Sequence, residues 1–422
     1  MDKPKCWKTC RHGIIFLSFL VISACQTAAP PSRLKLATLL PLTGDLAAYG
    51  SSMQESARLL VDRVNACGGA LGQPVELLSQ DDQTDPAAGA SAMARLAEVD
   101  RVVGVVGAAS SAVSSAAVEI AVRNQVIIIS PASTSPVFSD RARRGEFKGF
   151  WLRTAPPDTF QGEALAKLAT ARGYRSVAVL AINNDYGNGL LSSFIPNFEA
   201  LGGKVTNKAN PARYAPDSST FDSVVSATFK GDPDAVLVIA YPDTGSLVLK
   251  TAYEQGLLGK KTKVLATDGL KETKIAEQIG KNTQGEYIAA GIVGTAASAG
   301  GPALQSFRDR FTAQYKRQPK VYDPNTWDAT ALLVLAAEAA KSSTTTAIRD
   351  KLREVSNPPG EAVTDVCQAL SLIRAGRKVN YQGASGSVDL NPEGDVMGTY
   401  DVWTIEPDGS LKVIGAIAAS GQ

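Results

Sequence analysis

The sequence predicts an α/β protein of two lobes, each built from alternating strands and helices. The clearest observation behind this prediction is a strand–helix–strand unit at residues 102–136. Its short apolar runs at 102–106 and 126–129 are typical of buried parallel strands, and residues 112–123 between them have helical character. A second series of strands and helices follows at 155–266. A length of 422 residues also favours two lobes of ordinary size over one domain.

Two loops of small polar residues leave the carboxyl ends of these strands, where open α/β sheets bind ligands. They span residues 107–111 and 130–136. Ser110 and Ser111 also open a helix, whose N–H groups and dipole favour an anion such as a carboxylate or a phosphate. The alternative is that these residues only cap the helix and turn the chain.

Composition excludes several classes of protein. The single histidine, His12, lies in a leader at residues 1–24, so the mature chain has none. Histidine-dependent triads and histidine metal sites are therefore excluded, and we expect no metal and no cofactor. Cleavage of the leader removes four basic residues and one acidic residue. The formal net charge then changes from +2 to −1, which leaves no basic patch for nucleic acid.

Residues 1–24 have the pattern of a bacterial signal peptide. A basic start precedes an apolar stretch at 14–22 that is too short to span a membrane. Small residues before Cys25 resemble a lipobox, so we predict cleavage before Cys25 and lipidation of that residue. The protein would then be anchored on the periplasmic side of the cell envelope, with inner or outer membrane left open. A plain signal peptide or an unprocessed anchor is the alternative.

Three cysteines remain after this cleavage: Cys25, Cys67 and Cys367. If Cys25 is lipidated, the other two lie in an oxidising compartment, where a disulfide between them is favoured. Such a bridge would close a loop of roughly 300 residues. Two free buried thiols are the alternative.

The first lobe begins after a short polar tether at 25–33. Strands are expected at 34–40, 75–79, 102–106, 126–129 and 150–154, and helices at 52–66, 87–98 and 112–123. Gly68 and Gly69 end the first long helix, as glycine does at a helix C-terminus. Pro156 and Pro157 follow the strand at 150–154 and restrict the backbone where we expect the first crossing between lobes.

The second lobe repeats this alternation. Strands are expected at 176–182, 204–207, 235–240 and 263–266, and helices at 160–172, 189–200, 219–230 and from about 245 to 255. Later helices are expected at 307–316, 326–340, 345–354 and 365–375, and late strands at 401–405 and 411–414. The predicted first lobe therefore spans 34–154 and 267–378, and the second spans 155–266 and 379–422.

The mature chain resembles the solute-binding proteins of branched-chain and neutral amino-acid ABC transporters. The matching pieces stand in family order over nearly the whole mature chain: LLPLTGDLAAYG, VNACGGALGQPVELLSQDDQTDP, VVGAASS, IIISPASTSP, FWLRTAPPDTFQG, NNDYGNGL, IAYPD and ATDG. The resemblance implies the type I periplasmic-binding-protein fold. In this fold two α/β lobes are joined by three crossing segments and close on a ligand by hinge motion.

The resemblance also implies a binding site. The ligand carboxylate is expected at Ser111 and at the second loop, with its residues Ala132, Ser133 and Thr134. A lobe-two acid, Asp268, is expected to hold the ligand ammonium.

Three tyrosines complete the expected site. Tyr241 is expected near the ammonium, and Tyr49 and Tyr186 are expected to wall the side-chain pocket. Each assignment has a simpler alternative, because Asp268 could form an ordinary turn and the tyrosines could pack on their own lobe.

Other polar residues have simpler explanations. Asp81, Asp82 and Asp85 form an acidic group, but Asp85 before a proline favours a helix start over a metal site. Asn65 and Arg153 are expected to be structural.

The predicted function is that of an uptake receptor, which delivers an amino acid to a membrane permease and is expected to be a monomer. A ligand-sensing lipoprotein and a binding protein for amides, urea or aromatic acids are the alternatives. An enzyme is not expected, because the mature chain has no histidine, no metal cluster and no nucleophile motif.

Overall fold

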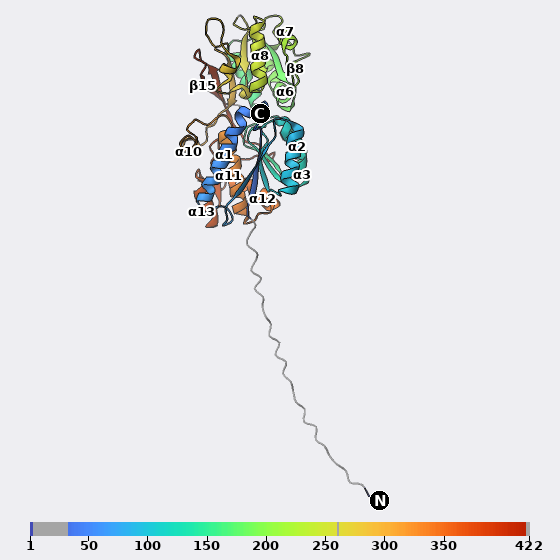
Figure 1. Ribbon diagram of the computed structural model, residues 1–422, viewed down its shortest axis with the longest axis vertical. Coiled ribbons are helices and arrows are strands. Elements are labelled where there is room, and N and C mark those ends of the chain that lie inside the picture. The colour runs from blue at the N-terminus through green and yellow to red at the C-terminus, as the bar shows by residue number, and fades with distance from the viewer. Residues whose placement is uncertain (3–32, 260, 419–422) are drawn as a thin grey trace. The chain divides into compact units, whose positions relative to one another are not determined.

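The computed structural model describes residues 1–2, 33–259 and 261–418. The leader, the lipidation site at Cys25 and nearly all of the tether at 25–33 lie outside the described residues. From Arg33 onward the described residues belong to one compact unit, which holds two large sheets (Figure 1). Among the described residues, no helix has both the length and the apolar character needed to pass through a lipid bilayer.

The first lobe is built on a five-stranded parallel sheet in the order β2-β1-β3-β4-β5. The strands are β1 (Lys35–Leu40), β2 (Glu76–Asp81), β3 (Gly104–Gly107), β4 (Ile127–Ser130) and β5 (Trp151–Arg153). One face carries α2 (Pro86–Ala94), α3 (Ser111–Arg123) and α4 (Val137–Arg143), with a π-helical turn at Arg95–Val99. The other carries α1 (Ala47–Ala66), α10 (Leu304–Tyr315), α11 (Asp323–Ala340), α12 (Thr345–Ser356) and α13 (Val366–Arg374).

The second lobe is built on an eight-stranded sheet in the order β15-β14-β11-β10-β9-β6-β7, with β8 also paired to β6. Its strands are β6 (Ser176–Ile182), β7 (Lys204–Val205), β8 (Ala212–Tyr214), β9 (Ala235–Ile239), β10 (Lys263–Ala266), β11 (Val293–Ala297), β14 (Thr399–Ile405) and β15 (Leu411–Ala418). Only the β11–β14 and β14–β15 pairs are antiparallel. The helices are α5 (Asp158–Ala171), α6 (Asp185–Ala200), α7 (Asp222–Phe229), α8 (Pro242–Glu254) and α9 (Ile275–Ile279), with a 3₁₀ turn at Asp268–Leu270.

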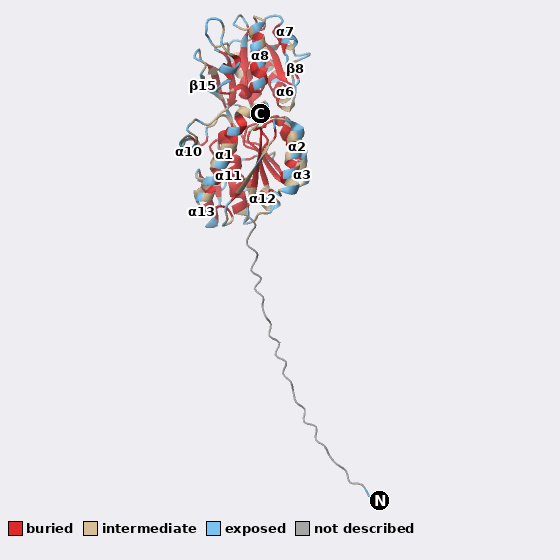
Figure 2. Ribbon diagram, viewed as in Figure 1, coloured by how far each residue is buried: buried red, intermediate tan, exposed pale blue. Residues whose placement is uncertain are grey.

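Continuous apolar runs form the central strands, as expected for parallel sheets covered on both faces. Every residue of β9 is buried, and so is every residue of β6 after Ser176. Figure 2 shows the central strands of both sheets in red, with exposed residues gathered on the outer helices, the loops and the edge strand β15. The first lobe has a separate hydrophobic cluster on each face of its sheet. The core of the second lobe belongs to one large cluster.

The chain returns to the first lobe later than the predicted boundary at 267. β11 pairs with β10 and with β14, so residues 267–297 belong to the second lobe. This strand was missed because its sequence, VGTAA, lacks the bulky residues that mark a buried strand. Close packing explains why these residues are small, because a Cβ atom on Gly294 would lie 2.6 Å from the ring of Trp403.

The last crossing also differs from the predicted boundary at 379. β13 (Val379–Tyr381) pairs with β12 (Glu361–Val363) of the first lobe, and apolar residues up to Val396 pack in that lobe's core. The chain then enters the second lobe at β14. The three crossing segments lie together, because Ser298 donates a backbone hydrogen bond to Thr399 and Gly398 packs against Pro156.

Cys67 and Cys367 form a disulfide, the pairing that the sequence favoured. Their Cα atoms are 5.9 Å apart although 300 positions separate them in sequence. The bridge joins the end of α1 to the start of α13, so it ties together two helices of the first lobe.

Candidate functional site

A cavity between the lobes gathers loops that follow strands of both sheets. Its lining consists of Leu46, Tyr49, Met53, Ala109, Ser111, Ala132, Tyr186, Tyr241, Asp268, Gly269 and Tyr322. Six of the eight predicted ligand-binding residues are among them: Tyr49, Ser111, Ala132, Tyr186, Tyr241 and Asp268.

The first-lobe end of the cavity is built from main chain and small side chains. Ser111 is the first residue of α3, and Ser110 before it makes no side-chain cap to the helix. Gly107 allows the tight turn after β3, because its φ is +148° and a Cβ atom there would lie 2.0 Å from the oxygen of Leu39. The start of α3 therefore presents backbone N–H groups and a positive helix end to the cavity.

The second loop is held in place by hydroxyl hydrogen bonds. Ser130 Oγ donates to the oxygen of Ala108 at 2.6 Å and accepts the N–H of Ser133 at 2.8 Å. Ser133 Oγ lies 2.8 Å from Ser114 Oγ and 3.1 Å from the oxygens of Ala108 and Ala109. The side chain of Ser133 therefore joins the two loops and does not line the cavity, contrary to the role expected for it.

Arg153 holds the loop at residues 130–136 in place, which agrees with the structural role expected for it. Its guanidinium is fully buried, donates to the oxygens of Ser133 and Ser135 at 3.1 and 2.9 Å, and pairs with Asp395 at 2.7 Å. A buried charge paired in this way orders the backbone that follows β4.

The second-lobe end of the cavity is acidic. Asp268 follows β10 and is 4% exposed. Its Oδ1 accepts a hydrogen bond from the hydroxyl of Tyr186 at 2.9 Å, and its Oδ2 accepts one from the hydroxyl of Tyr322. Burial raises the pKa of Asp268, while hydrogen bonds from Tyr322 and Tyr186 oppose that rise.

A second carboxylate, that of Asp158, lies beside Asp268 and was not predicted as a site residue. Asp158 is the first residue of α5 and is fully buried. Neither of its carboxylate oxygens has a hydrogen-bond partner among the described residues. Burial raises the pKa of Asp158 well above its usual value, and the charge of Asp268 raises it further. Two acidic groups thus share one buried space.

Thr134 lies next to this carboxylate rather than on the cavity wall. Its main-chain oxygen accepts the N–H of Asp158 at 2.8 Å. Its side chain is buried, and within the described part of the chain its hydroxyl also has no partner. The side chain of Thr134 and the charge of Arg153 both oppose the rise in the pKa of Asp158.

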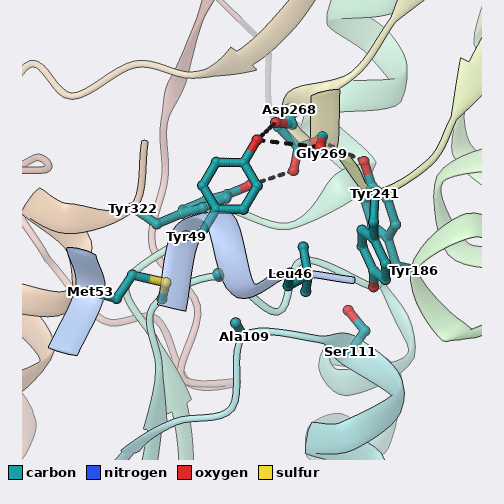
Figure 3. Close-up of a pocket in the computed structure, with 11 residues that line it drawn as sticks. Leu46, Tyr49, Met53, Ala109, Ser111, Tyr186, Tyr241, Asp268, Gly269 and Tyr322 are labelled. Atoms are coloured by element: carbon teal, nitrogen blue, oxygen red, sulfur yellow. Dashed lines mark hydrogen bonds between the residues drawn. The ribbon is translucent and has the colours of Figure 1, made fainter. Parts of the chain in front are cut away.

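Tyrosine rings form the walls of the cavity (Figure 3). Tyr186 and Tyr241 stack with ring centroids 5.4 Å apart. On the opposite side, the hydroxyl of Tyr49 lies 3.3 Å from the main-chain oxygen of Gly269. Leu46, Met53 and Ala109 supply apolar surface to the rest of the lining.

Tyr322 was missed by sequence reasoning and carries a strained backbone. Its φ is +70°, a conformation uncommon for a bulky residue, and it immediately precedes α11. Its hydroxyl donates a hydrogen bond to Asp268, 54 positions earlier in the sequence. No local pattern marks Tyr322, whereas Leu46, Ala109, Asp158 and Gly269 lie inside the sequence pieces quoted above.

Comparison with known proteins agrees with this architecture. The family described as "Receptor family ligand binding region" matches residues 52–408. A chemotactic signal transduction system substrate-binding protein from Halobacterium salinarum is 29% identical over 360 residues, which cover 84% of this chain and 82% of that protein.

Two solved structures have a similar fold. A leucine-binding protein from Thermotoga maritima has a TM-score of 0.76 and 26% identity, over 91% of this chain and 99% of that one. A solute-binding protein of an ABC transporter from R. palustris, in complex with benzoate, has a TM-score of 0.72 and 19% identity, over 92% and 97%. The predicted fold of two α/β lobes is thereby confirmed.

Proposed function

The protein belongs to the receptor family ligand binding region, and from this premise we propose that it is the extracytoplasmic substrate-binding protein of an ABC importer for a neutral or branched-chain amino acid. It is a periplasmic binding protein of the leucine-binding type and not an enzyme, as the sequence resemblance indicated.

The observation that carries the proposal is the opposition of charge across the cavity. The N-terminus of α3 is positive and belongs to the first lobe, whereas Asp268 belongs to the second lobe and Asp158 lies beside it. An amino-acid zwitterion has one anionic group and one cationic group, so its two ends match these two places. A ligand that touches both lobes stabilises the closed state by its own binding energy.

The rest of the cavity favours a small neutral side chain. Leu46, Met53, Ala109 and Ala132 are apolar, and the tyrosine rings present flat apolar faces. Among the described lining residues none is basic, so nothing there would pair with an acidic side chain.

An aromatic acid is less well matched. The solved relative from R. palustris binds benzoate, but benzoate has an anionic group and no cationic one. It would leave the carboxylate of Asp268 without a cationic partner in a buried space, where an unpaired charge is costly. The acidic pair therefore supports an ammonium-bearing ligand over benzoate, urea or a simple amide.

Delivery to a permease and attachment to a membrane complete the proposal. The leader and Cys25 support a lipidated mature protein tethered through residues 25–33, which would keep the receptor near its membrane partner. A sensing role is the second candidate, because a relative from H. salinarum is named as part of a chemotactic signal transduction system.

A ligand screen tests the proposal. The mature protein would be heated with each of the twenty amino acids, with benzoate, urea and acetamide as matched controls, and hits would be measured by calorimetry. A ligand present at about 100 times its Kd adds about 2.7 kcal/mol to the stability. Stabilisation by a few neutral amino acids supports the proposal. A response to benzoate or urea alone, with silence from every amino acid, contradicts it.

A transport assay separates uptake from sensing. Deleting the gene should abolish accumulation of the radiolabelled ligand if the protein serves an importer. Normal accumulation with lost chemotaxis toward the same ligand would favour the sensing role.

A further inference from the structure

Helix α8 of the second lobe begins without a cap from its own lobe. Tyr241 occupies the N-cap position and makes no side-chain cap, and Pro242 at the first helical position has no N–H to donate. The next two N–H groups, those of Asp243 and Thr244, are consequently the first that need an acceptor.

The acceptor comes from the first lobe. Asp45 Oδ1 accepts the N–H groups of Asp243 and Thr244, each at 3.0 Å, and Asp45 Oδ2 accepts the hydroxyl of Thr244 at 2.8 Å. These three bonds have the form of an N-cap, but the capping carboxylate is about 200 positions away in sequence and lies on the opposite lobe. The negative charge of Asp45 also faces the positive end of α8.

The loop that carries Asp45 is held firmly against its own sheet. Asp81 accepts hydrogen bonds from the N–H groups of Leu42 and Thr43 at 2.9 and 3.2 Å, and Thr84 Oγ1 accepts the N–H of Leu46 at 3.1 Å. Gly44 has a φ of +84°, and a Cβ atom there would lie 2.1 Å from the oxygen of Gln83. Asp45 is therefore presented by a rigid support, which lowers the entropic cost of the contact.

The same helix start carries part of the binding site. Tyr241 lines the cavity and its hydroxyl lies 3.3 Å from Ser110 Oγ, across the two lobes. Asp45 itself does not line the cavity. Its contacts exist only when α8 approaches the first lobe, so opening the lobes must break all three.

We propose that Asp45 is a positioning residue that caps α8 across the cleft and thereby stabilises the closed, ligand-holding arrangement of the lobes. The inference rests on the proposed function, since it concerns how a bound ligand is retained. Loss of a helix N-cap changes a folding equilibrium by about fivefold, and we expect a change of that size in the ratio of closed to open molecules.

A fivefold change in the ratio of closed to open molecules must be visible either in the ligand affinity or in the closed fraction of the ligand-free protein. If the ligand-free protein is mainly open, its ligand affinity falls by nearly the full factor when Asp45 is removed. If it is mainly closed, the affinity changes little but the closed fraction falls. In both cases ligand release requires opening, so the dissociation rate should rise by up to about fivefold.

The experiment compares Asp45→Ala, Asp45→Asn and Asp85→Ala in the mature protein. Asp85 is the matched control, because its carboxylate caps α2 within the first lobe by accepting the N–H of Ala88 at 2.7 Å. Electron-spin distance measurements between labels at the exposed positions Thr206 and Thr346 report the closed fraction without any ligand. Stopped-flow release of a ligand found in the screen reports the dissociation rate.

We expect Asp45→Ala to lower the closed fraction or the affinity and to speed release. Asp45→Asn should do so less, because asparagine is also a good N-cap. Asp85→Ala should lower the melting temperature but leave the closed fraction, the affinity and the release rate unchanged. Unchanged lobe distances together with an unchanged release rate in Asp45→Ala would overturn the inference. A screen without any ligand, but with a reduced closed fraction in Asp45→Ala, would reject the proposed function and leave the role of Asp45 standing.

Discussion

The two ends of the cavity are made in different ways. At the first-lobe end, Ser111, Ala109 and Ala132 are small, and recognition would come from the main chain at the start of α3. At the second-lobe end, recognition would come from the side chains of Asp268, Tyr186 and Tyr241. A main-chain site is a property of the fold, whereas a side-chain site can be changed by single substitutions. The second lobe is therefore the place where selectivity is expected to reside.

Asp268→Asn should have the largest effect on this comparison. The substitution keeps the shape but removes the charge opposite the ligand ammonium, and loss of one partner from a buried ion pair costs about 3–5 kcal/mol. Calorimetry should show affinity reduced by more than about 100-fold. Asp217→Asn, at an exposed position of the same lobe, is the control. If Asp268→Asn keeps its affinity, Asp268 does not bind the ligand ammonium.

Removal of the disulfide should affect stability rather than binding. The bridge between Cys67 and Cys367 lies wholly in the first lobe and away from the cavity. The double substitution to serine should lower the free energy of unfolding by about 2–4 kcal/mol, measured by urea titration. Ligand affinity below the melting temperature should stay the same, and a large loss of affinity would show that the bridge shapes the binding site.

Asp158→Asn should weaken binding by about tenfold and remove its pH dependence. Burial and the charge of Asp268 raise the pKa of Asp158, which favours its protonated form in the ligand-free site. A nearby ammonium favours the ionised form and lowers this pKa, so affinity should rise as the pH rises through the raised pKa of the ligand-free site, with release of a proton on binding. Calorimetry in buffers of different ionisation enthalpy would count the protons. If Asp158→Asn releases the same number of protons on ligand binding, the proton comes from another group.

Ser111→Ala should have the smallest effect. If the main chain of α3 holds the ligand carboxylate, loss of one hydroxyl should cost only about 1 kcal/mol, or about a fivefold change in affinity. A loss as large as that of Asp268→Asn would mean that the first-lobe end also depends on side chains, and the contrast between the two ends would fail.

Individual residues show where sequence reasoning succeeds. The family resemblance implied site roles for Asp268 and Tyr186, and the structure places both on the cavity wall. Both follow apolar runs that form strands, and residues after parallel strands meet at one edge of a sheet. Ser133 was misplaced because a loop of serines and threonines does not reveal which hydroxyl faces outward. That choice depends on hydrogen bonds to Ser114 and Ala108.

The boundaries between lobes were predicted less well than the elements. The small residues of β11 suit a strand only because Trp403 covers Gly294, and Trp403 lies more than a hundred positions later. The segment that ends at Val396 lacks a strong pattern, yet its apolar residues complete the core of the first lobe. Such assignments depend on long-range packing, which propensity does not contain.

The sequence by itself determined most of the strands and helices in their order, the partners of the disulfide and the presence of an acid after β10. These follow from hydrophobic periodicity, from the number of cysteines and from the position of polar residues at strand ends. Only the tertiary structure decided that Asp158 shares a buried space with Asp268, that Tyr322 reaches the same carboxylate, and that Asp45 caps a helix of the other lobe. Desolvation, charge coupling and capping across the cleft act through space, so they exist only once distant segments have been brought together.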